Sequence, residues 1–467
     1  MLAAGVFISP DSFWIDEGNT AYKASQPTLS AWFHALTAVS SSDAQMPGYM
    51  IYLWMWEKIA GHSEFALRLS NLPWLALIVM SLRRFPFAIL FALTSPFILN
   101  YLGELRPYLM QISGAALAVN GLSRIAVKPA SGWRRSLAGC LIMSASSLLG
   151  VVWSLGALIY VIVENSSRLK CPWFWRGCLT FLPAFGILGT YYAWTLAEGQ
   201  GAALMGGGFI VSAAAVAYEL LGLAGLGPEK VRVRVDPKSL LEYAWILIPA
   251  ALTTGGLILW GCYQWSTTTP RRRFVAVVCG VGIPILMLLT LLVFKDFRVL
   301  GRHFAPMAPL LILLLARTST LHPGSRQAHL GSHFNIAVIA VWLVIAIGLA
   351  SSLSLRFAPR HRKDDYRTAA SIARNAIKQK TPVIWVADRW TGYFYGLDEA
   401  HSGWQPWRDS MPLPILDNRE IVILTKPDIY DSKGGMRALL MQRGFIPIRQ
   451  LPAFTVFEHP TLSSISR

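Results

Sequence analysis

Long apolar runs separated by short charged loops dominate the first three quarters of the chain. Residues 274–294 and 334–355 carry no charge, and each is long enough as a helix to cross about 30 Å of hydrocarbon. Eight shorter or interrupted apolar runs are also predicted to span: roughly 66–82, 85–103, 106–122, 136–150, 151–163, 177–196, 241–263 and 303–316. The pattern therefore predicts a polytopic α-helical membrane protein with about ten spans.

Composition supports this class. Of the 467 residues, 54% are hydrophobic and 14% are charged, whereas soluble domains carry about 25% charged residues. This shortage of charge leaves too little polar surface to cover a soluble body, and it excludes disordered, collagen-like and coiled-coil classes. The five cysteines form no CxxC pattern, so we expect neither a disulfide framework nor a cysteine metal site.

The net charge of +17 is divided unevenly along the chain. Five short loops hold 14 Lys and Arg against one acid, Glu164, and the rest of residues 1–359 holds 12 basic and 13 acidic residues. This asymmetry predicts that the five loops are cytoplasmic, so the basic balance argues for orientation and not for a nucleic-acid partner. Their basic residues are Arg83, Arg84, Arg124, Lys128, Arg134, Arg135, Arg168, Lys170, Arg176, Arg271, Arg272, Arg273, Arg317 and Arg326.

This orientation has consequences for the remaining segments. The apolar segment 207–226 must lie on or dip into the outer surface without crossing, which its many Gly and Ala residues allow. Residues 11–65 and the tail then lie on the extracytoplasmic side of what we expect to be a bacterial inner membrane. Residues 1–10 are too few to span, and we expect that a first helix is missing or truncated.

The tail changes character after the last apolar run. Strand-like stretches at 382–387, 420–425, 445–449 and 453–458 alternate with helix-like stretches at 366–379 and 433–443. This alternation predicts a small α/β domain. We therefore expect two domains, a transmembrane domain at 1–359 and an extracytoplasmic α/β domain at 360–467.

Adjacent carboxylates stand in the first outward loop, at Asp16 and Glu17. Two carboxylates side by side suit a general base with a supporting acid. The alternative is structural, with Asp16 capping a helix N-terminus and Glu17 solvated. The sequence leaves both interpretations open.

Three further polar groups recur at the outward ends of spans. The first contains Asp43, Gln45 and Tyr49, and an interfacial aromatic belt would explain its rings without any function. The second contains Glu104, Arg106 and Tyr108. Here Arg106 is a candidate for holding an anionic head group, and the alternative is a turn in which Glu104 and Arg106 neutralise each other. The third contains Lys295, Arg302 and His303. Cations at the outer leaflet do not serve the positive-inside rule, so they are candidates for binding phosphate, whereas His303 alone is typical of a helix end.

The order of these motifs resembles a known family. The set comprises Trp14-Ile-Asp16-Glu17, Asp43-x-Gln45-x-Pro47-x-Tyr49, Gly61-His-Ser-Glu64-Phe-Ala-Leu-Arg68, Glu104-x-Arg106-Pro-Tyr108 and a later Arg302. It is similar to GT-C membrane glycosyltransferases of the protein-mannosyltransferase and aminoarabinose-transferase type, which are glycosyltransferase family 39-like. The resemblance covers 13–122 well, 295–316 loosely and the tail hardly at all. Met46-Pro47-Gly48 departs from the family's usual Pro-Pro, which affects the acceptor side.

The resemblance implies inverting transfer of a sugar from a polyprenyl-phosphate donor to a glycan, glycolipid or protein acceptor on the outer face. Asp16 would be the catalytic base, supported by Glu17. Arg106, Lys295 and Arg302 would bind the donor phosphate. Glu104, Tyr108, Gln45, Tyr49 and His303 would support the site.

No cofactor is expected, and the few carboxylates near Asp16 do not support a divalent cation. Two non-catalytic alternatives remain, an outer-leaflet glycolipid flippase or transporter and an assembly partner. The flippase or transporter would explain the spans and the cations, but not why carboxylates stand in a loop and not at the bilayer midplane.

Overall fold

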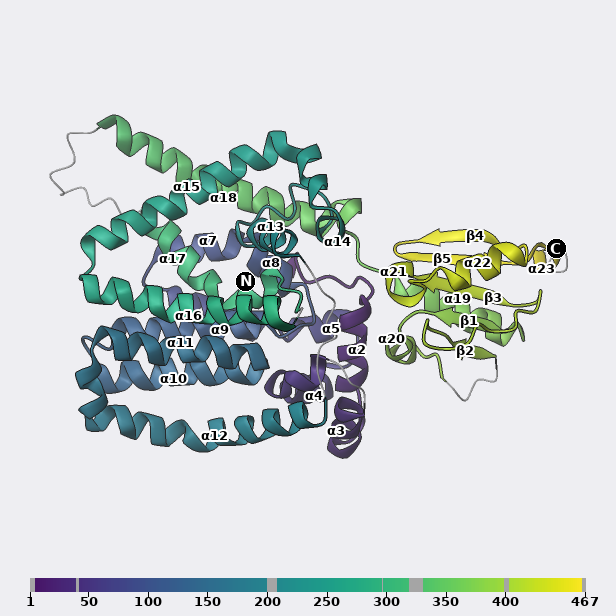
Figure 1. Cartoon of the computed structure of the whole chain (residues 1–467), viewed down its shortest axis with the longest axis horizontal. Coiled ribbons are helices and arrows are strands. Elements are labelled where there is room, and N and C mark those ends of the chain that lie inside the picture. Colours follow the sequence, from purple (N-terminus) through teal and green to yellow (C-terminus); the bar gives the residue numbers. More distant parts are fainter. Residues whose placement is uncertain are drawn as a thin grey trace. The chain divides into compact units, whose positions relative to one another are not determined.

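The computed structural model describes residues 5–38, 42–199, 208–295, 297–318, 331–398 and 403–463. The chain forms two compact units, each built from separate stretches of sequence (Figure 1). Unit 1 contains 1–8, 33–53 and 68–361, and unit 2 contains 9–32, 54–67 and 362–467. The tail predicted as a domain of its own therefore shares its compact unit with two N-terminal segments.

Unit 1 is helical. Its main elements in chain order are η1 (Ser42–Gln45), α4 (Pro47–Ala60, shared with unit 2), α6 (Leu72–Leu82), α7 (Pro86–Thr94), α8 (Pro96–Leu102), α9 (Tyr108–Arg124), α10 (Pro129–Ser146), α11 (Leu148–Glu164), η2 (Ser166–Lys170), α12 (Pro172–Ala197), α13 (Phe209–Leu220), α14 (Lys230–Val235), η3 (Pro237–Tyr243), α15 (Ala244–Thr268), α16 (Arg271–Lys295), η4 (Gly301–Met307), α17 (Ala308–Thr318), α18 (Gly331–Phe357) and η6 (Pro359–His361).

Four helical stretches of the described chain are long and apolar enough to cross a membrane, namely Glu64–Leu82, Pro237–Thr268, Arg271–Phe294 and Val338–Phe357. With the small sheet of unit 2, they agree with the predicted class, a helical membrane protein. The segment 207–226, which the topology requires not to cross, contains α13. The 12 residues of this helix extend only about 18 Å, less than the thickness of the hydrocarbon core.

Several predicted spans are broken or shifted for local reasons. The run 85–103 divides into α7 and α8, because Ser95 caps α8 by accepting from the amide of Ile98 at 3.4 Å. The expected boundary at 150/151 lies four residues earlier. There the side chain of Ser147 accepts from the amide of Gly150 at 3.3 Å and begins α11.

Small residues allow the long helices to approach closely. Helices α9 to α12 and α16 run alongside one another (Figure 1). A Cβ added to Gly114 on α9 would lie 2.7 Å from the carbonyl oxygen of Gly139 on α10. One added to Gly156 on α11 would lie 2.2 Å from the carbonyl oxygen of Gly280 on α16. Backbone contact through small residues is typical of helix packing in membranes.

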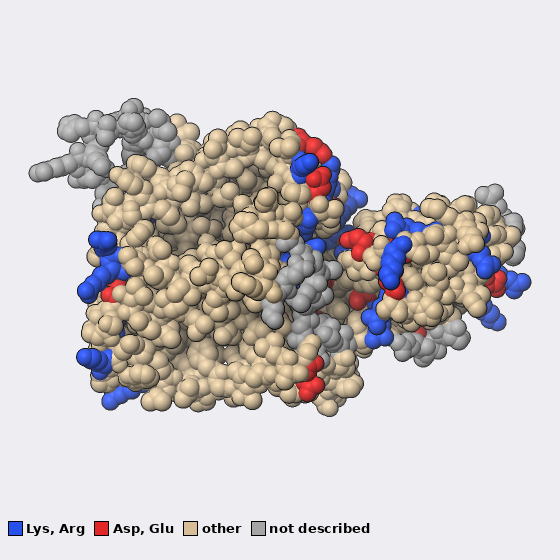
Figure 2. Space-filling view, in the orientation of Figure 1, with Lys and Arg blue, Asp and Glu red and all other residues tan. Residues whose placement is uncertain are grey.

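Lys and Arg side chains stand at both ends of unit 1 on the face drawn in Figure 2. Contacts among the loops predicted to be cytoplasmic gather those loops at one of these ends. Glu164, at the end of α11, binds Arg168 in the next loop and Arg273 on α16. Arg317 at the end of α17 donates to Thr268 at the end of α15. Four arginines from two further loops lie within electrostatic reach of one another, namely Arg83, Arg84, Arg124 and Arg135. The basic loops that the sequence groups on one side thus share one end, except for Arg326, which lies outside the described residues.

Unit 2 is an α/β domain with a five-stranded sheet in the order β2-β1-β3-β5-β4. Strands β1 to β3 are parallel, and β5 and β4 continue the sheet in antiparallel fashion. The elements of the tail are α19 (Tyr366–Lys378), β1 (Val383–Val386), α20 (Arg389–Phe394), β2 (Trp404–Pro406), β3 (Ile421–Thr425), α21 (Pro427–Tyr430), α22 (Gly435–Gln442), β4 (Ile446–Leu451), β5 (Phe454–Glu458) and α23 (Pro460–Ser463). The N-terminal segments add α2 (Ile15–Ala24) and parts of α3 (Leu29–Thr37) and α5 (Glu64–Leu69).

Alternating side chains of β1 bury both faces of this sheet. Val383 and Trp385 belong to the core that includes α19, and Ile384 and Val386 belong to the core that includes α22. The four predicted strands and both predicted helices are present within one or two residues of their expected ends. The sequence missed β2, α20, α21 and α23.

Candidate active site

The carboxylates at Asp16 and Glu17 lie in the first turn of α2. The residue that precedes the helix in extended conformation is Trp14, so the alternative of Asp16 as the N-cap is wrong. Asp16 is partly exposed, whereas Glu17 is completely buried. Acidic side chains in a first turn are favoured by the partial positive charge of the helix N-terminus.

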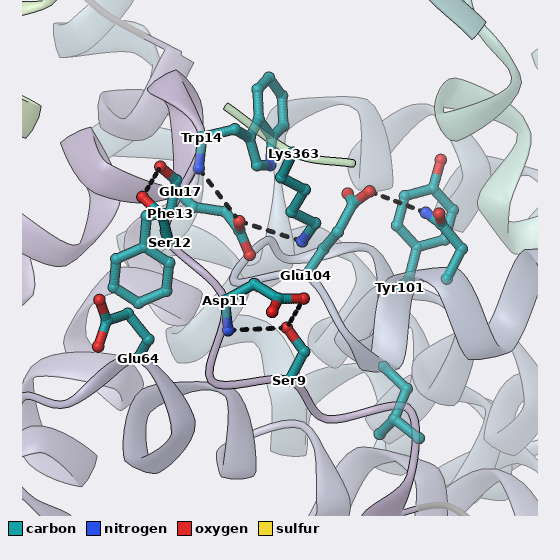
Figure 3. A network of polar contacts seen from close by, with 12 residues as sticks. Ser9, Asp11, Ser12, Phe13, Trp14, Glu17, Glu64, Tyr101, Glu104 and Lys363 are labelled. Carbon is teal, nitrogen blue, oxygen red and sulfur yellow. Dashed lines mark hydrogen bonds and ion pairs between the residues drawn. The ribbon is translucent and has the colours of Figure 1, made fainter. Parts of the chain in front are cut away.

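Glu17 is neutralised by a residue from the far end of the chain. The ammonium of Lys363 lies 3.1 Å from its Oε2, and the backbone amide of Trp14 donates to the same oxygen at 3.5 Å (Figure 3). Lys363 itself keeps 25% of its side chain exposed. A buried carboxylate requires such a partner, and no local pattern in the sequence indicates Lys363.

The loop before α2 is fixed by Tyr395, also in unit 2. Its hydroxyl accepts from the amide of Phe13 at 2.8 Å and donates to Glu64 at 3.0 Å. Arg367 binds the same Glu64 carboxylate at 2.7 Å. Glu64 of the third motif thus helps to hold the segment that carries Asp16.

A second carboxylate, Asp388, belongs to the electrostatic surroundings of Asp16. Burial raises the pKa of Asp388 to about 6; hydrogen bonds from Thr391 and the charge of Lys23 oppose the rise, and the charge of Asp16 adds to it. Asp388 lies two residues after the end of strand β1. A carboxylate at the carboxyl end of a buried parallel strand was a usable signal that the sequence reading passed over.

In unit 1 the second and fourth motifs meet. Arg106 donates from Nη1 to Asp43 at 2.9 Å and from Nη2 to Ser42 at 3.2 Å. Arg106 and Asp43 are 3% and 2% exposed. Of the other members, Gln45 is partly buried at the end of η1, and Tyr49 is fully buried on α4.

The alternative to phosphate binding by Arg106 is a turn in which Glu104 and Arg106 neutralise each other, but the side-chain hydrogen bonds of these two residues lead to other partners. Glu104 accepts a hydrogen bond from Asn100 at 2.8 Å. The turn itself is held by Asn71, which is fully buried and donates to the carbonyl oxygens of Tyr101, Leu102 and Glu104 at 2.7 to 3.1 Å. Asn71 is a structural residue that the sequence reading missed.

The later cationic group approaches the same turn. The guanidinium of Arg302 lies 5.9 Å from the ring centre of Tyr108, a cation–π distance. The neighbouring His303 accepts the amide of Leu300 at Nδ1 at 3.1 Å, and its ring stacks on Phe297. This is the helix-end role considered for His303. Lys295 ends α16, and its side chain lies outside the described residues.

Additional cations come from α14, which the sequence reading did not select. The ammonium of Lys230 lies 5.9 Å from the ring centre of Tyr101. Arg234 binds the buried Glu219 at 3.3 Å. Lys230, Glu219 and Tyr101 line one shallow hollow together with Asn100. The alternating run Lys-Val-Arg-Val-Arg-Val was the signal available in the sequence.

The two charged ends of unit 1 are separated by the length of α9. Tyr108 begins this helix and Arg124 ends it, and 17 residues extend about 25 Å. In the part of the chain that the structure describes, no group of three or more His, Cys, Asp or Glu gathers to hold a metal ion.

Comparison with known proteins gives structural matches only. No protein-family profile and no curated protein matches the chain. ArnT from Cupriavidus metallidurans in the apo state is similar over 98% of this chain and 95% of its own, at 12% identity and a TM-score of 0.45. ArnT bound to undecaprenyl phosphate gives 13% identity, 98% and 96% coverage and the same score. The arabinofuranosyltransferase AftD from Mycobacteria gives 14% identity and 0.45, over 98% of this chain and 39% of its own.

ArnT and AftD are GT-C glycosyltransferases, the group that the sequence motifs resemble. Because the identities are 12 to 14% and the TM-scores are 0.45, these matches carry no argument about catalysis. The catalytic roles are therefore argued from the chain's own residues.

Proposed function

We propose that the protein is a membrane glycosyltransferase. It transfers a sugar, with inversion, from a polyprenyl-phosphate donor to a glycan, glycolipid or protein acceptor on the extracytoplasmic face. Asp16 removes the acceptor's proton as the acceptor oxygen attacks the anomeric carbon. The bond from that carbon to the phosphate oxygen breaks, and the phosphate leaves with the lipid.

One observation carries this proposal: two adjacent carboxylates stand in different environments. Glu17 is buried and paired with Lys363, whereas Asp16 is partly exposed in the same helical turn. Different environments are how neighbouring carboxyl groups acquire different roles. The arrangement supports Asp16 as the base and Glu17 as the residue that holds its helix.

The charge distribution of unit 1 supports binding of the donor phosphate at the end that carries Arg302 and Lys230. The predicted cytoplasmic loops contact one another at one end of the long helices, and we assign that end to the cytoplasm. Lys and Arg side chains also stand at the opposite end (Figure 2). Arg302, Lys230 and Arg234 lie about one helix length away, near the start of α9. We propose that Arg302 and Lys230 bind the departing phosphate, with Lys295 and Arg106 contributing. We propose that the end with Arg302 and the C-terminal domain both face the extracytoplasmic side. The chain then crosses the inner membrane about ten times.

The test is transfer by the purified chain in lipid nanodiscs. The donors are undecaprenyl phosphates carrying radiolabelled hexoses or pentoses, and the acceptors are lipid A, other glycolipids and peptides. Asp16→Asn should lower kcat at least 100-fold, since a general base contributes about 10² to 10⁴ in rate. Asp11→Asn is the matched control, because Asp11 is an exposed carboxylate of the same segment. Full activity of D16N would remove Asp16 from the mechanism.

The same preparation separates the proposal from the transporter alternative. A glycosyltransferase forms a new glycosidic bond with inverted anomeric configuration, which nuclear magnetic resonance of the product detects. Movement of labelled lipid between leaflets without a new bond would support the transporter and overturn the proposed function.

A further inference from the structure

The helix that carries Asp16 packs directly on α20 of the C-terminal sheet domain, within unit 2. Gly18 of α2 faces Thr391 so closely that an added Cβ would lie 2.2 Å from the Thr391 methyl carbon. Aromatic rings flank this contact, with Tyr22 against Trp390 at 5.3 Å and Phe13 against Phe394 at 5.4 Å between ring centres. The C-terminal domain therefore fixes both ends of the segment from Phe13 to Tyr22.

A single hydroxyl joins the two helices at the position of the predicted base. Oγ1 of Thr391 lies 2.7 Å from Oδ2 of Asp388 and 3.2 Å from the carbonyl oxygen of Ile15, the residue before Asp16. The Thr391 amide also donates to Oδ2 of Asp388 at 2.7 Å, and Thr391 is fully buried. Water does not replace these bonds without opening the interface.

The Thr391 hydroxyl has one proton and two acceptors within reach, so the state of Asp388 decides where that proton goes. When Asp388 is ionised, the hydroxyl donates to the carboxylate. When Asp388 is protonated, its own O–H donates to Oγ1, and the hydroxyl is free to donate to the Ile15 carbonyl. The pKa of about 6 for Asp388 brings both states into the physiological range. The titratable groups that face Asp388 are Asp16 and Lys23 on α2, Tyr366 on α19 and Tyr430 on α21.

We propose that Thr391 and Asp388 are positioning residues for Asp16, which set the place of the Asp16 carboxylate through the Ile15 carbonyl and the Gly18 contact. The inference rests on the proposed function, because it assigns a purpose to holding Asp16. It gives the C-terminal domain a role in the transfer reaction.

The experiment compares Thr391→Val, which removes the hydroxyl and keeps the shape, with Thr391→Ser, which keeps the hydroxyl. Thr455→Val is the matched control, because the Thr455 hydroxyl bonds to Gln450 on an exposed part of the sheet. Gly18→Ala is an independent variant that pushes the helices apart without removing the hydroxyl. The full chain in nanodiscs is assayed for transfer and for amide hydrogen exchange in the peptide covering 13–24.

T391V and G18A should lower kcat about tenfold to 100-fold with the donor KM within about twofold, because misplacement of a reacting group by about 1 Å costs rate of that order. T391S should recover most of the lost rate, and T455V should behave as the unchanged chain. Exchange in 13–24 should rise in T391V and G18A and remain low in T391S.

The two readouts separate the possible failures. If the unchanged chain transfers sugar but T391V keeps its kcat, or if exchange in 13–24 does not change, the positioning role is overturned. A fall in rate that T391S does not recover also overturns it, since a loss of packing alone would then explain the effect. If the unchanged chain forms no glycosidic bond with any donor, the proposed function fails, and exchange still reports whether Thr391 docks α2.

Discussion

The ion pair between Glu17 and Lys363 allows a quantitative prediction. Glu17 is completely buried and its Oε2 lies 3.1 Å from the Lys363 ammonium, which is 25% exposed. Coulomb's law at an effective dielectric constant of about 20 gives about 5 kcal/mol for unit charges at this distance. Removing one partner of a fully buried pair costs about 3 to 5 kcal/mol. Because solvent screens the exposed part of Lys363, we expect Lys363→Met to lower the free energy of unfolding by about 2 to 3 kcal/mol.

The assay is a urea titration of the purified chain in detergent, followed by tryptophan fluorescence, with transfer activity measured on the same samples. Lys363→Arg keeps the charge and should lose less stability. Lys378→Met is the matched control, because Lys378 is exposed on α19 and surface changes usually stay within about 0.5 kcal/mol. Glu17→Gln combined with K363M should recover part of the loss, since no charge is then left without its partner. Equal unfolding midpoints for K363M and the unchanged chain would refute the reasoning.

Three further predictions follow from other contacts. Asp43→Asn leaves the buried Arg106 guanidinium without its carboxylate and should cost about 3 to 5 kcal/mol, measured by thermal unfolding; if adding Arg106→Gln recovers nothing, the pair is not coupled. The raised pKa of Asp388 means that the docked carboxyl binds its proton more tightly than an unfolded one, so α2 docking should weaken as pH rises through about 6. In Asp388→Asn, amide hydrogen exchange of residues 13–24, corrected for intrinsic rates, should stay from pH 5 to 7.5 at the slow rate that the unchanged chain shows at low pH. A pH profile identical to that of the unchanged chain would contradict this. The topology is tested in a chain whose native cysteines are replaced, with a thiol reagent that does not cross the membrane. Ser167→Cys should react only after permeabilisation, because we place Ser167 in the cytoplasm, and Lys238→Cys should react in intact cells. The reverse pattern would refute the topology.

The helical part of the fold was largely predictable because hydrocarbon-length runs depend on local composition. Helices α9, α11, α12, α15, α16 and α18 cover the predicted runs. The boundaries moved where a single side chain caps a helix, as Ser147 does for α11. The sequence predicts no span within residues 11–65, yet they contain the helices α2, α3 and α4. Their weak local signal comes from short helices whose packing is set by distant residues.

The tail was predictable where β-branched and aromatic residues alternate between turn residues. Strands β1, β3, β4 and β5 meet that description. Strand β2 does not, since it has only Trp404, Gln405 and Pro406 and pairs at the sheet edge. Proline in an edge strand leaves no pattern that separates it from a loop.

The candidate site was predictable in its residue types but not in its pairing. The sequence selected Glu17 and Arg106 as site residues. Glu17 pairs with Lys363, 346 residues away, and Arg106 pairs with Asp43, 63 residues away. Local sequence carries no information about such distances.

The division of the chain into units bears on what the tail is for. Sequence composition changes near residue 360 and suggests a boundary there, but residues 9–32 belong to the same compact unit as 362–467. Glu17 is paired with Lys363, Phe13 is held by Tyr395, and Ile15 is reached by Thr391. If the tail were an independent binding module, the segment with the predicted base would not need three separate anchors from it. The arrangement favours a tail that completes the reaction site by holding α2, and this is why substitutions at Lys363 and Thr391 test the catalytic proposal from outside its motifs.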